Sequence, residues 1–302
     1  MTQEIEAGAA TLSEAPTARR AGDLLRDIAA NRFALAAAAF LVLMALLAFI
    51  GPLVLPLEPY KTNLSRLDEG PSWDHLLGTD QSGRDTFARC ILGARTSLIV
   101  GFSAVAIYLV IGTLLGSLAG YLGGVVDMIV SRTVDALLSI PLLLLVTVFI
   151  AFLKPGVLTV ILVIGLLGWP PTARITRAAT MSLRESDFII AARVSGLTKN
   201  RIMRGHVLPN LAAPLIVVAS LGIGTAILLE AALGFLGLGV RPPTPSLGVM
   251  VTEAKDPVIL RNSPWIWMPP AVLLALLVMA VNVVGDALRD VLSPRQGGTA
   301  GL

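Results

Sequence analysis

The stretch IIAARVSGLTKNRIMRGHVLP, residues 189–209, lies between two apolar runs of membrane-spanning length. The window from Arg174 to Arg204 holds seven arginines and lysines against two acids, Glu185 and Asp187. A segment this basic is costly to bury in lipid, so it is predicted to be a loop in water beside the membrane. At about 35 residues, it is too long to be a simple connection between two spanning helices.

The backbone pattern of this loop predicts two helices joined by a sharp turn. Residues 181–194 have helical spacing, and Ser195–Gly196 is expected to end that helix, because glycine is preferred just past a helix C-terminus. Thr198 is positioned to cap a second helix over residues 199–206, which Pro209 is predicted to end. We interpret the arrangement as a docking element for a cytoplasmic partner. The alternative is a basic loop that only sets membrane topology.

The composition of the chain predicts a polytopic membrane protein. Its 302 residues are 55% hydrophobic and 14% charged, with a mean hydropathy of +0.80. Such values are atypical of soluble domains. The net charge of +3 comes from basic residues beside apolar runs, which favours membrane topology over nucleic-acid binding. Cys90 is the single cysteine, so an internal disulfide is excluded and no metal site is expected.

The apolar runs predict an all-α fold with six transmembrane helices, since about 20 apolar residues cross a bilayer. The predicted spans are residues 33–55, 96–126, 134–153, 157–173, 211–240 and 265–287. The distribution of basic residues places both termini and the loop at 174–210 in the cytoplasm. The resulting division of the chain is a tail at 1–31, a first helix with an external segment at 32–95, a core at 96–290 and a tail at 291–302.

Small residues in the second predicted span indicate close helix packing. Gly112, Gly116, Gly120 and Gly124 recur at every fourth position, which places them on one helix face. We expect another helix to approach along that face. The alternative for the last position is that Gly123 and Gly124 end the helix.

Polar residues in the spans are the candidates for a translocation pathway, because an isolated charge in lipid is costly. Glu230 is the acid well inside a predicted span, and it either faces a central cavity, pairs with Arg241 or is solvated near the outer surface. Asn282 either touches a transported solute or joins two helices. Asp127, Arg132 and Asp135 are expected to form a solvated or paired cluster at the inner surface.

The external segment LGTDQSGRD, residues 77–85, has the composition of a tight, charged loop. Gly78 and Gly83 predict turns, and Asp80, Arg84 and Asp85 predict local ion pairs.

The loop at 174–210 resembles the EAA loop of ABC-importer permeases, which presents a coupling helix to an ATPase subunit. Ile190 stands where the family pattern has glutamate, and His206 where it has a hydrophobic residue. The matching positions are Ala191, Ala192, Gly196, Leu208 and Pro209. The resemblance implies that these positions and Ile190 form an ATPase-coupling site.

Six further motifs, in order along the chain, resemble the second permease subunit of dipeptide, oligopeptide and nickel importers. They are LGTDQSGRD (77–85), GARTSLIVG (93–101), AGYLGGVVD (119–127), LLSIPLLLL (137–145), LGFLGLGVRPPTPSLG (233–248) and NVVGDALRD (282–290). The resemblance implies a type I permease fold in the inner membrane of a bacterium or archaeon. It also implies a heterodimer with a homologous second permease, two ATP-binding subunits and an extracytoplasmic substrate-binding protein.

The expected function is ATP-driven uptake of di- or oligopeptides, with no catalytic residue and no cofactor in this chain. The sequence has no GxxxxGK[ST] phosphate loop, so ATP and Mg²⁺ are expected on the partner ATPases. The alternatives are uptake of nickel, glutathione or another small solute by the same kind of permease, or ion-coupled secondary transport. The last is disfavoured by the single embedded acid and the lack of an evident internal repeat.

Overall fold

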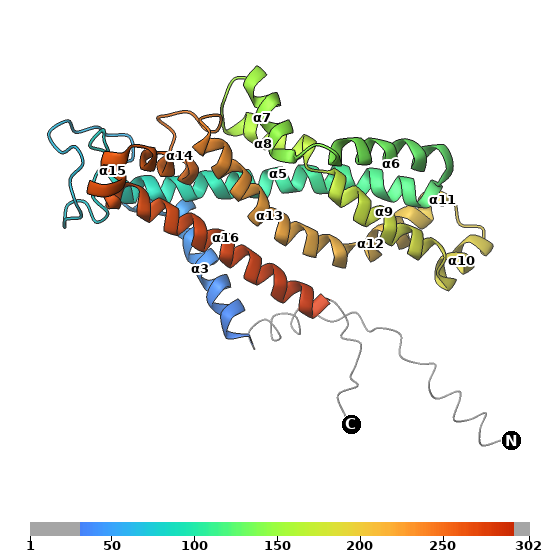
Figure 1. Cartoon of the computed structure of the whole chain (residues 1–302). Helices are drawn as coiled ribbons and strands as arrows, with labels where there is room; N and C mark the ends of the chain where they lie inside the picture. Colours follow the sequence, from blue (N-terminus) through green and yellow to red (C-terminus); the bar gives the residue numbers. More distant parts are fainter. Residues whose placement is uncertain (1–30, 293–302) are drawn as a thin grey trace, which may run out of the picture.

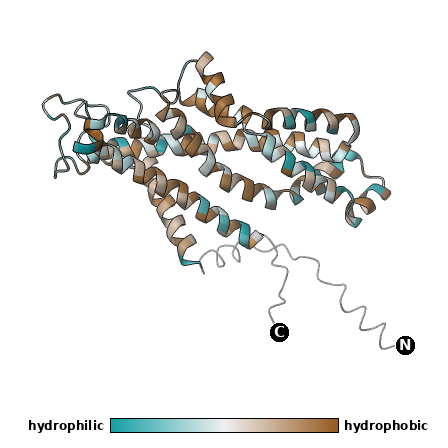
Figure 2. Cartoon of the chain, in the orientation of Figure 1, coloured by the Kyte–Doolittle hydropathy of each residue, from teal (hydrophilic) through white to brown (hydrophobic). Residues whose placement is uncertain are grey.

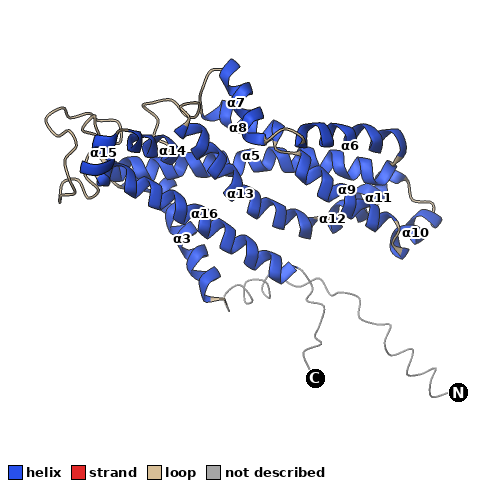
Figure 3. Cartoon of the chain, viewed as in Figure 1, coloured by secondary structure: helices blue, strands red, loops and turns tan. Residues whose placement is uncertain are grey.

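The structure, a computed structural model, describes residues 31–292 and shows an elongated bundle of helices (Figure 1). Helices and loops make up this part of the chain, which contains no β-strand (Figure 3). The predicted all-α class is therefore confirmed. The two predicted terminal tails, 1–31 and 291–302, lie almost wholly outside the described residues.

The longest helix of the described chain, α5, spans Thr86–Leu122 and forms the axis of the bundle. The other long helices are α3 (Arg32–Phe49), α6 (Gly124–Leu138), α7 (Leu142–Phe152), α8 (Val157–Leu167), α9 (Pro170–Arg184), α13 (Ala212–Phe235) and α16 (Pro264–Leu292). The short helices are α4 (Gly51–Val54), α10 (Asp187–Val194), α11 (Lys199–Ile202), α12 (Leu208–Asn210), α14 (Leu247–Val251) and α15 (Pro257–Asn262). A π-helical turn covers Met203–Val207, and a 3₁₀ turn covers Thr252–Lys255.

Among residues 31–292, five helical segments are long and apolar enough to cross a membrane. They are α3, α5, the continuous α8–α9 segment Val157–Arg184, α13 and α16. Helices α6 and α7 qualify only as a pair, which makes six spans if the pair is counted as one. Hydrophobic residues line the middle of these helices and hydrophilic residues gather toward the two ends of the bundle (Figure 2).

The span predicted at 134–153 is bent in the structure and has a different start. It begins inside α6, and the axes of α6 and α7 differ by 86° across the break that follows Leu138. Pro141 explains the break, because it has no N–H to donate and it disfavours helical geometry at Ile140.

Two other predicted boundaries also need correction. Helix α5 begins at Thr86 instead of residue 96, because the Asp85 carboxylate accepts a hydrogen bond from the Ala88 N–H at 2.7 Å and caps it. Charged residues in its first turns concealed this start. The span predicted to end at residue 173 continues through α9 to Arg184. The polar residues of α9 are accommodated by α5 and α6.

The predicted close packing of the glycine face on α5 is confirmed at three positions. A Cβ added at Gly112 would lie 2.6 Å from Cβ of Thr172, and one at Gly120 would lie 2.6 Å from the carbonyl oxygen of Arg177. A Cβ added at Gly116 would overlap the backbone of Ala173 in α9. These glycines let α9 lie directly against α5.

Gly124 does not take part in that packing, since a Cβ there would meet no atom within 4 Å. Gly123 and Gly124 have φ values of +67° and +55°, which glycine adopts at little cost. They end α5 and start α6, as the alternative interpretation predicted.

The acids of α6 pair with arginines of α9. Arg177 forms two hydrogen bonds with Asp127, one of them 2.7 Å long, and Arg174 Nη2 lies 2.8 Å from Asp135 Oδ1. The expected cluster of Asp127, Arg132 and Asp135 is thus replaced by two interhelical ion pairs, because α9 extends beyond its predicted end.

Candidate functional site

Residues 185–211, here called the basic loop, extend from one end of the bundle beyond α9 (Figure 1). Helix α10 ends at Val194, and Gly196 turns the chain with a φ of +78° before α11 begins at Lys199. The predicted helix, glycine turn and second helix are therefore confirmed. Thr198 occupies the N-cap position, but its side chain makes no capping hydrogen bond.

Two details of the basic loop differ from the prediction. The first helix is divided, because α9 ends at Arg184 and α10 starts at Asp187, with the extended residue Ser186 between them. Pro209 does not end the helical path. It lies in the first turn of α12, where a missing N–H is tolerated, and helical turns continue into α13.

A small hydrophobic core holds the basic loop against the bundle. Tyr121 of α5 and Leu211 pack with buried side chains of the loop, namely Ile189, Ala192, Ile202 and Val207. The sequence pattern could not reveal Tyr121 as a member of this core, because the residues it packs against are more than sixty positions away in the chain. Because α5, α9 and α13 all meet here, the loop and the bundle are tied together as one packed unit.

The outer side of the basic loop exposes apolar residues with a basic rim. Phe188 and Ile190 are partly exposed, and Val194 is 83% exposed. Beside them is a hollow of about 470 Å³ whose lining includes Ile190, Arg184, Arg193 and Lys199. The lining also contains one acid, Glu185. An exposed apolar patch with such a polar, mainly basic rim is typical of a protein-binding surface.

The structure places the matched loop positions on both sides of this element. Ile190 and Ala191 lie on the exposed side, whereas Ala192 is buried. Gly196 and Pro209 are exposed, and Leu208 is half-buried.

Glu230, a predicted pathway residue, has no exposed surface in the described chain. Its carboxylate accepts hydrogen bonds from Ser97 Oγ at 2.9 Å and from Ser246 Oγ at 2.5 Å. The suggested partner Arg241 is replaced by these two serines, which sequence reasoning did not identify. Glu230 thus links α13 to α5 and to the segment that precedes α14.

Asn282, the other predicted pathway residue, lies against α13. A Cβ added at Gly224 would be 2.7 Å from Asn282 Oδ1. This half-buried amide therefore occupies the contact between α13 and α16, as the packing interpretation expected.

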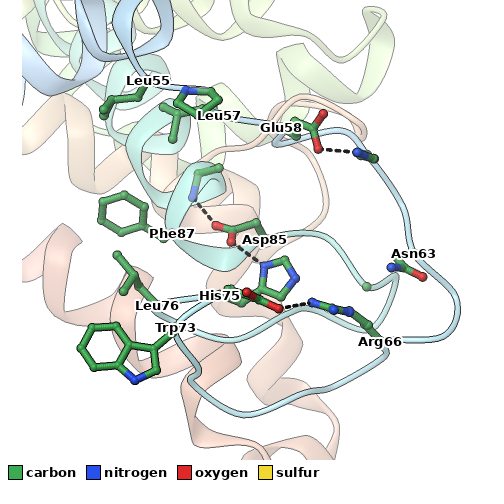
Figure 4. Close-up of a pocket in the computed structure, with 15 residues that line it drawn as sticks. Leu55, Leu57, Glu58, Asn63, Arg66, Trp73, His75, Leu76, Asp85 and Phe87 are labelled. Atoms are coloured by element: carbon green, nitrogen blue, oxygen red, sulfur yellow. Dashed lines mark hydrogen bonds and ion pairs between the residues drawn. The ribbon is translucent and has the colours of Figure 1, made fainter.

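The opposite end of the bundle carries residues 56–85 and a pocket of about 510 Å³. Figure 4 shows the residues that line this pocket. His75 Nδ1 lies 2.7 Å from Oδ2 of Asp85, the residue that caps α5. Trp73 at the rim is 97% exposed. The predicted turns and ion pairs are confirmed, since Gly78 and Gly83 have positive φ values and Arg84 Nε donates to Asp80 at 2.8 Å.

Glu253 beside this end predicts a pH effect on stability. Burial raises the pKa of the Glu253 carboxyl, and the negative charge of Asp80 raises it further. Protonation therefore favours the folded state. The stabilisation is complete below the pKa of the unfolded chain and is lost as pH rises through the higher folded pKa.

We expect Glu253→Gln to flatten the dependence of Tm on pH above about 4.3, the ordinary glutamate pKa. Thermal unfolding of the purified protein across that range is the measurement. The exposed carboxylate of Glu58 offers a control for the loss of a surface charge, and Glu58→Gln should change Tm little. An equal slope in the Glu253 variant and the natural protein would contradict this assignment.

Comparison with known proteins gives matches over most of the chain. Residues 112–298 match the model of the binding-protein-dependent transport system inner membrane component. Residues 20–71 match the N-terminal TM domain of oligopeptide transport permease C. Together the two matched ranges cover the first helix and the chain from residue 112 onward, and residues 72–111 lie between them.

Two curated relatives are similar along nearly their whole length. The dipeptide transport system permease protein DppC of Alkalihalophilus pseudofirmus is 40% identical over 90% of this chain and 89% of the relative. The di/tripeptide transport system permease protein DppC of Pseudomonas aeruginosa is 41% identical over 89% of this chain and 90% of the relative.

A solved structure is similar in fold. A chain of the inward-facing MetNI methionine ABC transporter aligns with a TM-score of 0.56 and 24% identity. The alignment covers 68% of this chain and 96% of that one.

Proposed function

Because this chain belongs to the family of binding-protein-dependent transport system inner membrane components, we propose that it is a permease subunit of an ABC importer for dipeptides and short oligopeptides. The relatives named for dipeptide and di/tripeptide transport support this substrate class over nickel or glutathione. As a transporter subunit it forms part of a membrane pore and catalyses no reaction itself.

The observation that carries this proposal is the basic loop. Its exposed apolar residues and cationic rim offer a surface to a cytoplasmic ATPase, and its buried side fits the bundle. We assign Ile190, Ala191 and Gly196 to the presentation of this surface. Ala192 and Leu208 hold the loop in place, and Pro209 lies in the first turn of α12, which leads out of the loop.

The complete importer that we propose contains a homologous second permease, two ATP-binding subunits and an extracytoplasmic substrate-binding protein. ATP and Mg²⁺ are bound by the ATP-binding subunits. The basic loop and both termini of this chain lie in the cytoplasm, and residues 56–85 lie on the outer side. The basic residues of the loop support that orientation.

The arrangement of helices explains how the loop transmits motion. Helix α9 leads into the loop, α13 leads out of it, and Tyr121 joins it to α5. When ATP binding closes the two ATPases, the loop moves with them, and the packed core beneath it moves these helices as a unit. The pore thereby alternates between two states that differ in affinity for the transported solute.

Gly196→Val is expected to uncouple ATP hydrolysis from transport. Valine is β-branched, and at a φ of +78° it is strained by on the order of 1–3 kcal/mol. Relief of that strain rotates α11 away from the ATPase subunit. We expect the complex to assemble and hydrolyse ATP, with uptake per ATP reduced about tenfold, the factor that corresponds to about 1.4 kcal/mol. Paired uptake and hydrolysis assays in proteoliposomes measure the ratio.

Gly205→Ala is the control for that variant. A Cβ at Gly205 meets no atom within 4 Å, and its φ is not positive. Normal uptake per ATP in the Gly196 variant would show that the turn does not present a coupling element.

The proposed function is tested first by purification of the complex in mild detergent, followed by mass spectrometry. Co-purification of a second permease and ATP-binding subunits is expected. The reconstituted complex with its binding protein should then accumulate labelled dipeptide when ATP is supplied. Recovery of this chain alone, where a control importer survives the same detergent, would oppose the proposal, and uptake of nickel without peptide would change its substrate.

A further inference from the structure

A pocket of about 290 Å³ lies between α9 and α13, with α5 behind it. Its lining is almost entirely apolar and uncharged. The residues used below are Tyr108 of α5, Gly168 and Thr172 near the α8–α9 junction, and Gly222 and Thr225 of α13. None of them belongs to the basic loop or to the pathway residues predicted from the sequence.

The pocket lies near the middle of the membrane. Gly222 is close to the midpoint of α13, Ala212–Phe235. Gly168 and Thr172 are on either side of the midpoint of the continuous span Val157–Arg184. Since the hydrocarbon core is about 30 Å thick, the pocket is about 15 Å from either surface of that core.

Tyr108 lies across the back of this pocket, where two glycines make room for it. A Cβ at Gly168 would lie 3.1 Å from Cδ1 of the tyrosine ring, and a Cβ at Gly222 would fall on the hydroxyl oxygen. The tyrosine is 92% buried, given its exposure of 8%. Within residues 31–292 its hydroxyl has no hydrogen-bond partner, although the residue lines the pocket.

An unpaired hydroxyl at this depth is costly and needs a polar partner. A lipid acyl chain has no group that accepts a hydrogen bond. A backbone carbonyl of a neighbouring transmembrane helix already accepts an intrahelical hydrogen bond, so it is a poorer acceptor for the tyrosine than a free carbonyl. A short peptide in transit has free carbonyl oxygens along its backbone, together with side chains that an apolar wall accepts.

We propose that this pocket is a subsite for the transported peptide, in which the Tyr108 hydroxyl donates a hydrogen bond to a backbone carbonyl of the peptide. This inference rests on the proposed function. The uncharged lining admits apolar and small polar side chains without selecting one sequence, because Tyr108 contacts the peptide backbone and most of the remaining lining is hydrocarbon.

The position of the pocket connects peptide binding to the basic loop. Its two walls, α9 and α13, are the helices that enter and leave that loop. Movement of the loop changes the separation of the walls and hence the fit of the peptide against Tyr108. Peptide is held when the walls are close and released when they separate.

The first test is Tyr108→Phe in the complete importer, reconstituted in proteoliposomes with its binding protein. Loss of one hydrogen bond is expected to lower uptake per ATP about two- to tenfold. The yield of complex, the basal ATPase rate and the affinity of the binding protein for peptide should stay unchanged. Unchanged uptake, or a lower yield of complex caused by a lost contact with the second permease, would overturn the subsite.

The second test measures access to the pocket by alkylation with N-ethylmaleimide. Thr225→Cys places a thiol in the pocket, and Leu228→Cys places one on an exposed part of α13 outside it. Both are made with Cys90→Ala, which removes the natural thiol. During turnover, saturating dipeptide should slow alkylation several-fold at position 225 and leave position 228 unaffected.

Equal rates with and without peptide at position 225, or equal protection at both positions, would overturn the subsite while the wild-type complex still imports peptide. If the wild-type complex imports no peptide, the proposed function itself fails. The two failures are therefore distinguishable in the same preparation.

Discussion

Gly116→Leu is expected to prevent stable folding of the bundle. The Gly116 Cα faces α9 so closely that an added Cβ would fall on the Ala173 carbonyl and the Thr176 hydroxyl. That hydroxyl also donates a hydrogen bond of 3.0 Å to the Gly112 carbonyl oxygen, which joins the two helices. A leucine must push α9 away, so it breaks this bond and opens the longest contact of the bundle.

The cost is on the order of 3 kcal/mol or more, since overpacking by a few methylene groups costs 1–3 kcal/mol. This is a large share of the stability of an ordinary domain. Because α9 leads directly into the basic loop, the coupling surface should be lost as well. We expect little or no assembled complex by size-exclusion chromatography, and a large fall in Tm of any protein that remains.

Gly156→Leu is the matched control, because a side chain at Gly156 meets no atom within 4 Å and the φ of 170° is ordinary extended backbone. Assembly of the Gly116 variant at the level of this control would mean that α5 and α9 are not in close contact.

Glu230→Ala is expected to have the second largest effect. The carboxylate is enclosed and accepts hydrogen bonds from Ser97 and Ser246. Its removal leaves a cavity and two hydroxyls without their acceptor, which costs about 2–4 kcal/mol. It also releases the segment that packs α14 against α13, where a Cβ at Gly248 would lie 2.6 Å from the Ala231 carbonyl oxygen.

Glu230→Gln should be much milder, because the amide keeps the volume and can hydrogen-bond both serines. Glu58→Ala, at an exposed carboxylate, should change Tm little. Thermal unfolding of the purified complex compares the three variants. If Glu230→Ala unfolds with the wild-type Tm and lowers only peptide uptake, Glu230 acts in the pathway, as first suggested from the sequence, and not in holding the fold.

Several features of this protein could be predicted from the sequence because they depend on neighbouring residues. The apolar runs identify the spans, since the bilayer requires about 20 apolar residues for each crossing. Ser195–Gly196 identifies the turn of the basic loop, because few residues other than glycine accept a φ of +78°. The repeat of Gly112, Gly116 and Gly120 identifies a packing face but not the helix that occupies it.

Helix boundaries were predicted less well where polar side chains have distant partners. The fourth span was predicted to end before Arg177, because a charged side chain is unfavourable in lipid. In the folded protein this charge is paired with Asp127, fifty positions away in the chain. Arg89 similarly concealed the start of α5, where Asp80 lies 3.2 Å from its guanidinium. A hydropathy pattern treats each charge as unpaired, so it ends a helix where the folded protein extends it.

By itself, then, the sequence determined the helical class, the approximate spans and the helix–glycine–helix form of the basic loop. These follow from local periodicity, glycine geometry and the thickness of the membrane. Only the tertiary structure decided that Glu230 is enclosed by Ser97 and Ser246. It also decided that Tyr108 lies between α9 and α13 with no hydrogen-bond partner among residues 31–292. Burial and pairing depend on which distant helices pack together, and a single sequence does not specify those contacts residue by residue.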